Sequence, residues 1–134
     1  MNKLIEQIKD ARLVWIIGNG GSAATAEHFA TDLIKKGIPA IALSSNTSVM
    51  TMIANDYGYD NVFLQQLKVY ARTDDLLITI SCSGTSKNIV QAINFARLVK
   101  IPVFSFETFE FDDNDYGKLE NKHLKFAHEV AKAL

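Results

Sequence analysis

Histidine and carboxylate side chains stand at helical spacing in two parts of the sequence. His28 and Asp32 are four residues apart, and Glu120 and His128 are eight residues apart. Either spacing brings both side chains to one side of an α-helix. Such a set can bind zinc or another divalent metal, or exchange protons as an acid–base pair. The alternative for each pair is a solvated helix surface.

A loop rich in hydroxyl groups is the second candidate site. The segment SCSGTS (81–86) directly follows an apolar run. Hydroxyls and the amides of a helix N-terminus together bind anions such as phosphate, although an ordinary N-cap turn favours the same residues. Within this loop we expect Cys82 to be a small apolar filler rather than a nucleophile. The hydroxyl-bearing residues are Ser81, Ser83, Thr85 and Ser86.

The glycine turn GNGGS (18–22) raises the question of a dinucleotide site. Gly18, Gly20 and Ala23 fit the pattern G-x-G-x-x-A. A dinucleotide site also needs an acidic residue about 20 positions later, at the end of the next strand. The sequence has LSSN (43–46) there, which argues against a nicotinamide cofactor.

These segments need a scaffold, and the composition indicates a globular one. The chain has 134 residues, of which 48% are hydrophobic and 22% charged, as in a single folded domain over 1–134. A net charge of −1 gives no field that would attract nucleic acid or an anionic membrane. The single cysteine excludes an intrachain disulfide, and the N-terminus lacks a signal-peptide core, so we expect a cytoplasmic protein.

Apolar runs of strand length alternate with helical periodicity along the chain. Together they predict a three-layer, doubly wound α/β domain with a mostly parallel central sheet of four or five strands. Ligands of such sheets bind beyond the carboxyl ends of the strands, where both special loops fall. The acidic segment 107–117, with Asp112 and Asp113, is predicted to be a solvated loop. Strands are expected at 13–17, 38–43, 76–80 and 101–106, a turn at 55–61, and helices at 2–11, 22–36, around Val49–Ile53, 62–71, 87–99 and 118–134.

Four segments together resemble one family. GNGGSAATAEHFATDL (18–33), ANDYGY (54–59), LLITISCSGTSKNIVQAINFAR (76–97) and LENKHLKFAHEV (119–130) are similar to the SIS (sugar isomerase) domain of phosphoheptose isomerases. The resemblance implies an isomerase of sedoheptulose 7-phosphate that forms a homodimer or homotetramer.

The resemblance also implies roles for individual residues. Asp32 and His128 would be the acid–base pair, and zinc would be bound by His28, Asp32, Glu120 and His128. Asn19 and Asp56 would line the sugar, with Gly20 beside them. The phosphate would be held by Ser22, Ser81, Ser83 and Ser86, with Thr85 next to them.

Several positions depart from the family pattern. Asp32 stands where the family has Glu, which withdraws the carboxylate by about one bond, ~1.5 Å. Glu120 replaces a neutral Gln, and Gly117 replaces an Asp for which Asp115 is a candidate substitute. The segments before GNGG and between VFSF and the last helix are also short. These departures leave open an alternative, a non-catalytic sugar-phosphate-binding module that acts as a sensor or adaptor.

Overall fold

Four parallel strands form the central sheet, in the order β2-β1-β3-β4. They are β1 (Val14–Gly18), β2 (Ala40–Ala42), β3 (Leu76–Ile80) and β4 (Val103–Ser105). Every residue of β1 and β3 is buried, because helices cover both faces of these two central strands. Burial on both faces is the reason why their sequences are nearly continuous apolar runs. The computed structural model describes residues 1–109 and 115–134.

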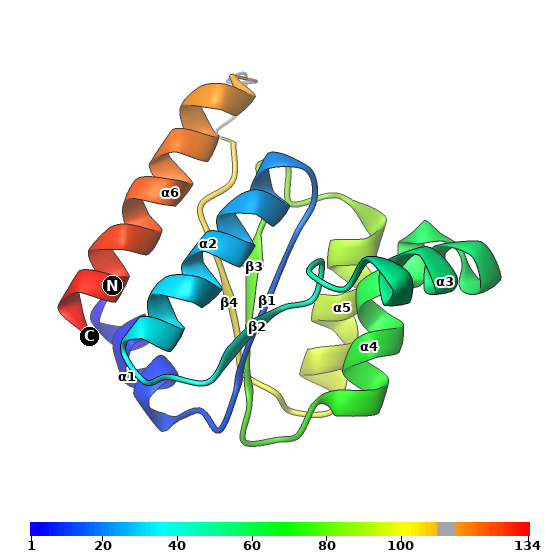
Figure 1. Ribbon diagram of the computed structural model, residues 1–134, viewed down its shortest axis with the longest axis horizontal. Coiled ribbons are helices and arrows are strands. Elements are labelled where there is room, and N and C mark those ends of the chain that lie inside the picture. The colour runs from blue at the N-terminus through cyan, green and yellow to red at the C-terminus, as the bar shows by residue number, and fades with distance from the viewer. Residues whose placement is uncertain (110–114) are drawn as a thin grey trace.

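Three helices cover each face of the sheet (Figure 1). α1 (Asn2–Asp10), α2 (Gly21–Lys35) and α6 (Tyr116–Ala133) pack on one face, together with Ile16 and Ile78. α3 (Thr47–Tyr57), α4 (Val62–Tyr70) and α5 (Lys87–Leu98) pack on the other, together with Ile17 and Leu77. Successive strand residues therefore enter opposite cores, as the pleat requires.

The order of strands places the two special loops beside each other. β1 and β3 are neighbours in the sheet, with Gly18 paired to Ile80 at their carboxyl ends. The chain leaves β1 for α2 on one face and leaves β3 for α5 on the other (Figure 1). Such a change of face opens a crevice at the strand ends, where doubly wound domains bind ligands.

Most predicted elements are confirmed, and the main differences lie at helix ends. The predicted turn 55–61 is wrong in its first part, because α3 continues to Tyr57 before Gly58 and a 3₁₀ turn, Tyr59–Asn61. α6 begins at Tyr116, earlier than predicted, because the side chain of Asp115 accepts a hydrogen bond from Lys118 N at 3.0 Å.

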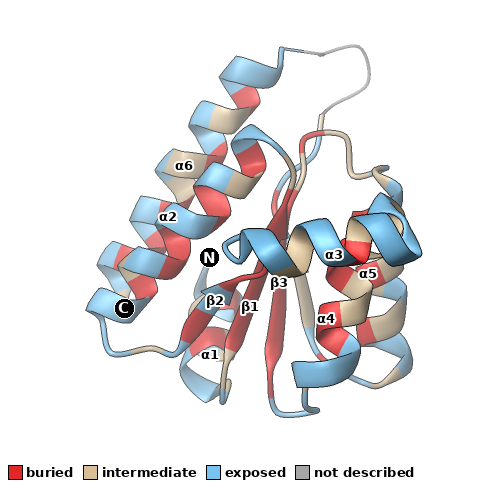
Figure 2. Ribbon diagram, turned by 45° about the vertical axis from the view of Figure 1, so that its right-hand side comes forward, coloured by how far each residue is buried: buried red, intermediate tan, exposed pale blue. Residues whose placement is uncertain are grey.

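The predicted acidic loop 107–117 falls partly outside the described residues, and Asp112 and Asp113 are among those outside them. Within 1–109 and 115–134, no helix is both long and apolar enough to cross a membrane. Figure 2 shows buried residues along the sheet and on the helix sides that face it, with exposed residues on the outer sides.

Candidate active site

A small pocket lies where β1 and β3 end, and we call it the serine pocket. Its volume is about 90 Å³. It unites both predicted loops with the first turns of α6, which the sequence alone does not bring to this place. The lining residues are Asn19, Ser22, Ser81, Cys82, Ser83, Ser86, Tyr116 and Glu120.

Hydrogen bonds within the loop fix the serine hydroxyls. Ser81 Oγ accepts from Gly84 N at 3.0 Å, and Ser83 Oγ accepts from Thr85 N at 3.2 Å. Ser22 lies in the first turn of α2 and is buried. The pocket therefore has hydroxyl groups from both loops beside the start of two helices, an arrangement suited to an anion.

Three of the predicted substrate residues do not line this pocket. Asp56 is exposed near the C-terminal end of α3, where its Oδ1 accepts from Asn55 Nδ2 at 2.9 Å. Thr85 is exposed at the outer side of the loop, and Gly20 is the exposed residue that precedes α2. Their predicted contacts with substrate stay predictions.

An amide pair that the sequence analysis missed joins the two loops. Asn19 Nδ2 donates to Asn88 Oδ1 at 2.9 Å, and Asn88 Nδ2 donates to Asn19 Oδ1 at 2.8 Å. Asn88 is 2% exposed, and the Tyr59 hydroxyl also donates to Asn19 Oδ1 at 2.9 Å. The sequence offered one sign of this pair: Asn88 is a polar residue next to Ile89, on the side of α5 that was expected to face the sheet. Asn88 therefore positions Asn19 at the pocket.

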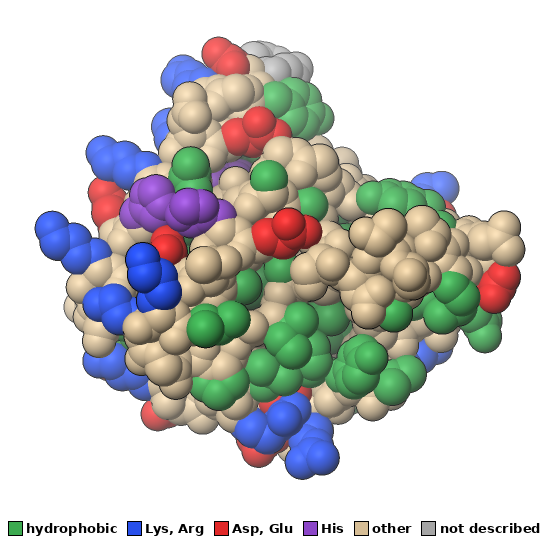
Figure 3. All heavy atoms as spheres, viewed as in Figure 1, with side chains coloured by type: hydrophobic (Ala, Val, Ile, Leu, Met, Phe, Trp, Pro, Cys, Tyr) green, Lys and Arg blue, Asp and Glu red, His purple; other side chains and the backbone are tan. Residues whose placement is uncertain are grey.

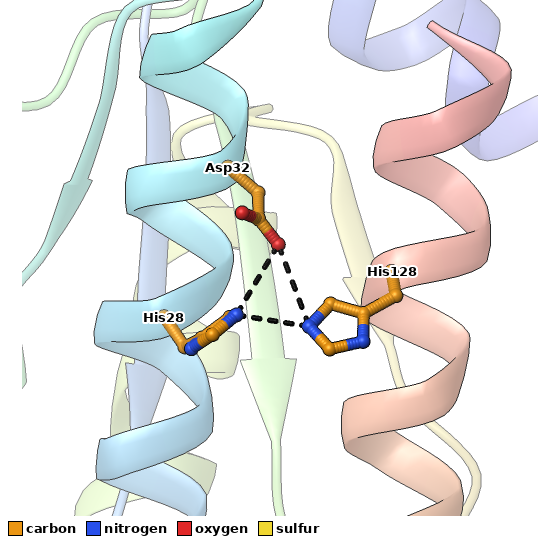
Figure 4. A group of neighbouring side chains, drawn as sticks. All are labelled: His28, Asp32 and His128. Carbon is orange, nitrogen blue, oxygen red and sulfur yellow. Dashed lines mark hydrogen bonds and ion pairs between the residues drawn. The ribbon is translucent and has the colours of Figure 1, made fainter.

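The facing helices α2 and α6 bring together His28, Asp32 and His128 (Figure 4). The two Nε2 atoms of the histidines are 2.9 Å apart, so one nitrogen donates and the other accepts. Asp32 Oδ2 lies 3.5 Å from His28 Nε2 and 3.7 Å from His128 Nε2. Half of each imidazole side chain is exposed, and Figure 3 shows histidine atoms over α2 and α6.

This group, which we call the His–Asp cluster, has the donor chemistry of a metal site. One atom from each residue lies within 4.8 Å of the others. Two nitrogen ligands bound tetrahedrally to zinc at ~2.05 Å are about 3.3 Å apart. The three observed separations, 2.9, 3.5 and 3.7 Å, scatter around that value. Small side-chain shifts would therefore let the cluster hold zinc or a similar ion.

Glu120, predicted as a fourth ligand, is not among the described residues whose ligand atoms come together in this cluster, and its role there stays a prediction. It lines the serine pocket, next to Gly21, where an added Cβ atom would lie 2.6 Å from Glu120 Cδ. Eight residues of helix separate it from His128 by about 12 Å along the axis. The spacing places both residues on one side of α6, but at different heights.

The surroundings of two other reactive side chains, Cys82 and His123, indicate structural rather than catalytic roles. Burial raises the pKa of the Cys82 thiol, and the charge of Glu120 raises it further, although a hydrogen bond with Ser22 lowers it. A thiol with a raised pKa is a poor nucleophile, which agrees with the predicted filler. His123 is buried against Phe106, with its Nε2 2.6 Å from Glu107 O. It serves the core rather than the cluster.

Comparison with known proteins identifies the family of the chain and several relatives. Residues 1–107 match the family model of the SIS domain. The phosphoheptose isomerase of Campylobacter concisus is 34% identical over 148 residues, covering 96% of this chain and 78% of the relative. That of Helicobacter pylori strain P12 is 41% identical over 123 residues, covering 87% and 62%.

A solved structure has the same fold over nearly the whole chain. Phosphoheptose isomerase GmhA from Neisseria gonorrhoeae superposes with a TM-score of 0.90 at 28% identity, covering 98% of this chain and 83% of that one. The strand order, the serine loop and the family match thus agree with the resemblance noted in the sequence. The chain belongs to the SIS-domain family and is a relative of the phosphoheptose isomerases.

Proposed function

We propose that this chain interconverts an aldose and a ketose form of a phosphorylated sugar, with sedoheptulose 7-phosphate as the first candidate. The observation that carries the proposal is the placement of the serine pocket and the His–Asp cluster along α2. Ser22 and His28 are six residues apart, which corresponds to about 9 Å along the helix. An extended seven-carbon sugar separates its phosphate from its carbonyl end by a comparable length.

In this proposal the serine pocket anchors the phosphate. The hydroxyls of Ser22, Ser81, Ser83 and Ser86 surround the cavity, and the N-termini of α2 and α5 direct positive partial charge toward it. Asn19, held by Asn88, would orient a sugar hydroxyl. Fixing the phosphate end limits the motion of the carbonyl end, which is how binding distant from the reaction accelerates it.

The reaction itself needs two proton transfers between carbon and protein. One group removes the proton from the carbon beside the carbonyl and leaves an enediol. Another returns a proton to the former carbonyl carbon, while the hydroxyl proton moves between the two oxygens. Asp32 and His128 are our candidates, because they face each other across α2 and α6.

A divalent metal is compatible with this cluster. His28, Asp32 and His128 would hold it, and zinc is the first candidate. Such an ion polarises carbonyl and hydroxyl oxygens. A histidine nitrogen that binds a metal cannot accept a proton at the same time. In the metal-bound form, Asp32 or the other ring nitrogen of His128, Nδ1, would therefore have to transfer the protons.

Exposed apolar side chains support self-association into a homodimer or homotetramer. Among them, Met52 is 48% exposed, Val69 77% and Tyr70 51%. Hydrophobic side chains gather over α3, α4 and the β2 edge in Figure 3. Light scattering coupled to gel filtration would show a multiple of 14.9 kDa if this surface joins subunits.

Two substitutions test the proposed reaction. Asp32→Asn and His128→Ala should each lower kcat by about 10²–10⁴ if the residues transfer protons. Glu129→Gln, next to His128 but outside the cluster, is the matched control and should retain the rate. Full turnover by His128→Ala would refute the role of that residue.

A further inference from the structure

We infer that Tyr59 is a positioning residue for the serine pocket: its hydroxyl group fixes the side chain of Asn19, so that Asn19 donates a hydrogen bond to an oxygen atom of the bound sugar. This inference rests on the sugar-phosphate function proposed above and adds to it the direction of one hydrogen bond. At this point the pocket would select a sugar oxygen that accepts a hydrogen bond.

Tyr59 connects the segment ANDYGY (54–59) to the pocket. α3 is followed by Gly58, whose φ of +86° lies in the region that favours glycine, and the chain then turns into the 3₁₀ turn that begins with Tyr59. The Tyr59 hydroxyl donates to Asn19 Oδ1 at 2.9 Å, across 40 positions of sequence. Asp56, in the same segment, is exposed and does not line the pocket. The printed contact of this segment with a pocket residue is therefore that of Tyr59.

A backbone amide fixes the direction of every hydrogen bond in this group. Ile89 N donates to Asn88 Oδ1 at 2.9 Å, and because a backbone N–H can only donate, the Asn88 atom it meets is the oxygen. Asn88 Nδ2 is then the atom that donates to Asn19 Oδ1 at 2.8 Å, while Asn19 Nδ2 donates to Asn88 Oδ1 at 2.9 Å. The Tyr59 hydroxyl approaches the same Asn19 oxygen and must also donate.

The consequence is that Asn19 offers a ligand a donor and not an acceptor. Its Oδ1 has two lone pairs, and the two donors from Asn88 and Tyr59 occupy them. Its Nδ2 has two N–H bonds, of which one is donated to Asn88. Asn19 lines the serine pocket, so its second N–H is the group that this side chain presents to a ligand there.

Tyr59 and Asn88 hold Asn19 from different sides. Asn88 is 2% exposed and belongs to the core side of the pocket, whereas Tyr59 is 54% exposed. Without the Tyr59 hydroxyl, Asn19 Oδ1 would be open to water or to a sugar hydroxyl, and the amide would be held from the core side alone. Tyr59 itself is not among the described residues that line the pocket, so its effect on a ligand passes through Asn19.

Calorimetric titration of the full chain tests this role. Sedoheptulose 7-phosphate and inorganic phosphate are titrated separately into the parent protein and into Tyr59→Phe, with a metal chelator present to slow turnover. Tyr57→Phe is the matched control, because it removes the same hydroxyl from a tyrosine of similar exposure, 57% against 54%, two residues away. Asn19→Ala, alone and combined with Tyr59→Phe, shows whether the effect passes through Asn19. Melting curves confirm that each variant is folded.

We expect Tyr59→Phe to bind the sugar phosphate about two- to tenfold more weakly, the worth of one hydrogen bond, and to bind inorganic phosphate as the parent does. Tyr57→Phe should leave both affinities unchanged. In the Asn19→Ala background, Tyr59→Phe should have no further effect, because the group it positions is absent.

Three results would overturn the inference. They are unchanged sugar-phosphate affinity in Tyr59→Phe, an equal loss for inorganic phosphate, which would indicate general damage to the pocket, and an undiminished loss in the Asn19→Ala background, which would indicate direct contact of Tyr59 with the sugar. If the parent binds neither ligand, the serine pocket is not a phosphate site, and the proposed function fails with the inference. If the parent binds the sugar phosphate without converting it, only the proposed isomerisation fails, and the titrations still decide the role of Tyr59.

Discussion

At the scale of single residues, the proposed chemistry depends on the reach of Asp32. Its Oδ2 lies 3.5–3.7 Å from the two histidine nitrogens, beyond an ordinary hydrogen bond. The family resemblance implies the longer Glu at this position. With one more methylene, the carboxylate could come closer to the two histidine nitrogens than the Asp32 carboxylate does.

Asp32→Glu tests this interpretation. The added carbon moves the carboxylate by ~1.5 Å, and misplacement by about 1 Å can cost 10²-fold in rate. We expect the variant to raise kcat by about tenfold, measured with sedoheptulose 7-phosphate. Asp32→Asn, which keeps the length and removes the charge, is the control. A Glu variant as slow as the Asn variant would show that reach is not the limiting feature.

Cys82 gives a prediction about pH. Its pKa is raised in the folded protein, so the folded thiol keeps its proton at pH values where the unfolded thiol releases it. Above about pH 8.5, the ordinary thiol pKa, the unfolded state binds fewer protons, and stability should fall as pH rises. Urea unfolding from pH 7 to 10 measures this fall. Cys82→Ala should flatten it, and an unchanged slope in that variant would contradict the assignment.

At the scale of elements, the amide pair between the two loops holds the pocket together. Asn88 bonds Asn19 twice, and its Oδ1 also accepts from Ile89 N at 2.9 Å. Asn88→Ala should lower the free energy of unfolding by about 1–3 kcal/mol, because it leaves buried polar groups without partners. Urea denaturation measures the loss, with exposed Asn94→Ala on the same helix as control. Equal effects of the two substitutions would argue against the pair.

The contact between α2 and α6 can be tested with a double-mutant cycle. Gly21→Ala should force the Glu120 carboxylate to shift, because the new Cβ would lie 2.6 Å from its Cδ; the cost is modest, since the carboxylate ends a flexible side chain. In the Glu120→Ala background nothing has to shift, and alanine should add about 0.5–1 kcal/mol through helix propensity. Thermal unfolding of the four proteins gives the coupling, expected at about 0.5 kcal/mol. Additive effects would show that the two side chains do not compete for this space.

The elements themselves were largely predictable, and the reasons are local. LVWII and LLITI are continuous apolar runs because β1 and β3 are buried on both faces. The end of α3 was missed because Asn55 and Tyr57 have the composition of a turn but complete the helix before Gly58. The early start of α6 depends on the cap formed by Asp115, whose effect a periodicity argument does not include.

At the scale of the whole molecule, topology explains which site predictions could succeed. The strand pattern placed both loops at the carboxyl ends of strands, and the observed strand order, in which β1 and β3 are neighbours, brings the two loops together. Helical spacing gave the direction of Glu120 and His128 around α6. It could not give the height at which α6 packs on α2, which depends on side chains such as Phe29 and Ala127 in the core.

The pairing of Asn19 with Asn88 was beyond the sequence for a similar reason. The two residues are 69 positions apart, and only the packed loops bring their amides together. The meeting of His28 with His128, which are 100 positions apart, was expected only because the family resemblance implied one metal site for both residues. The motifs give the types of residue at each site, and tertiary contacts of this kind decide which of those residues meet.

The most direct test of the account is an NMR assay of purified protein with sedoheptulose 7-phosphate in deuterated water, with zinc and with chelator. A sugar isomerase that uses protein acid–base groups should produce an aldoheptose phosphate and incorporate deuterium at the carbon that receives the proton. We predict this product, with faster formation when zinc is present. The absence of product at a concentration where the sugar phosphate raises the melting temperature would contradict the account and identify a binding module instead.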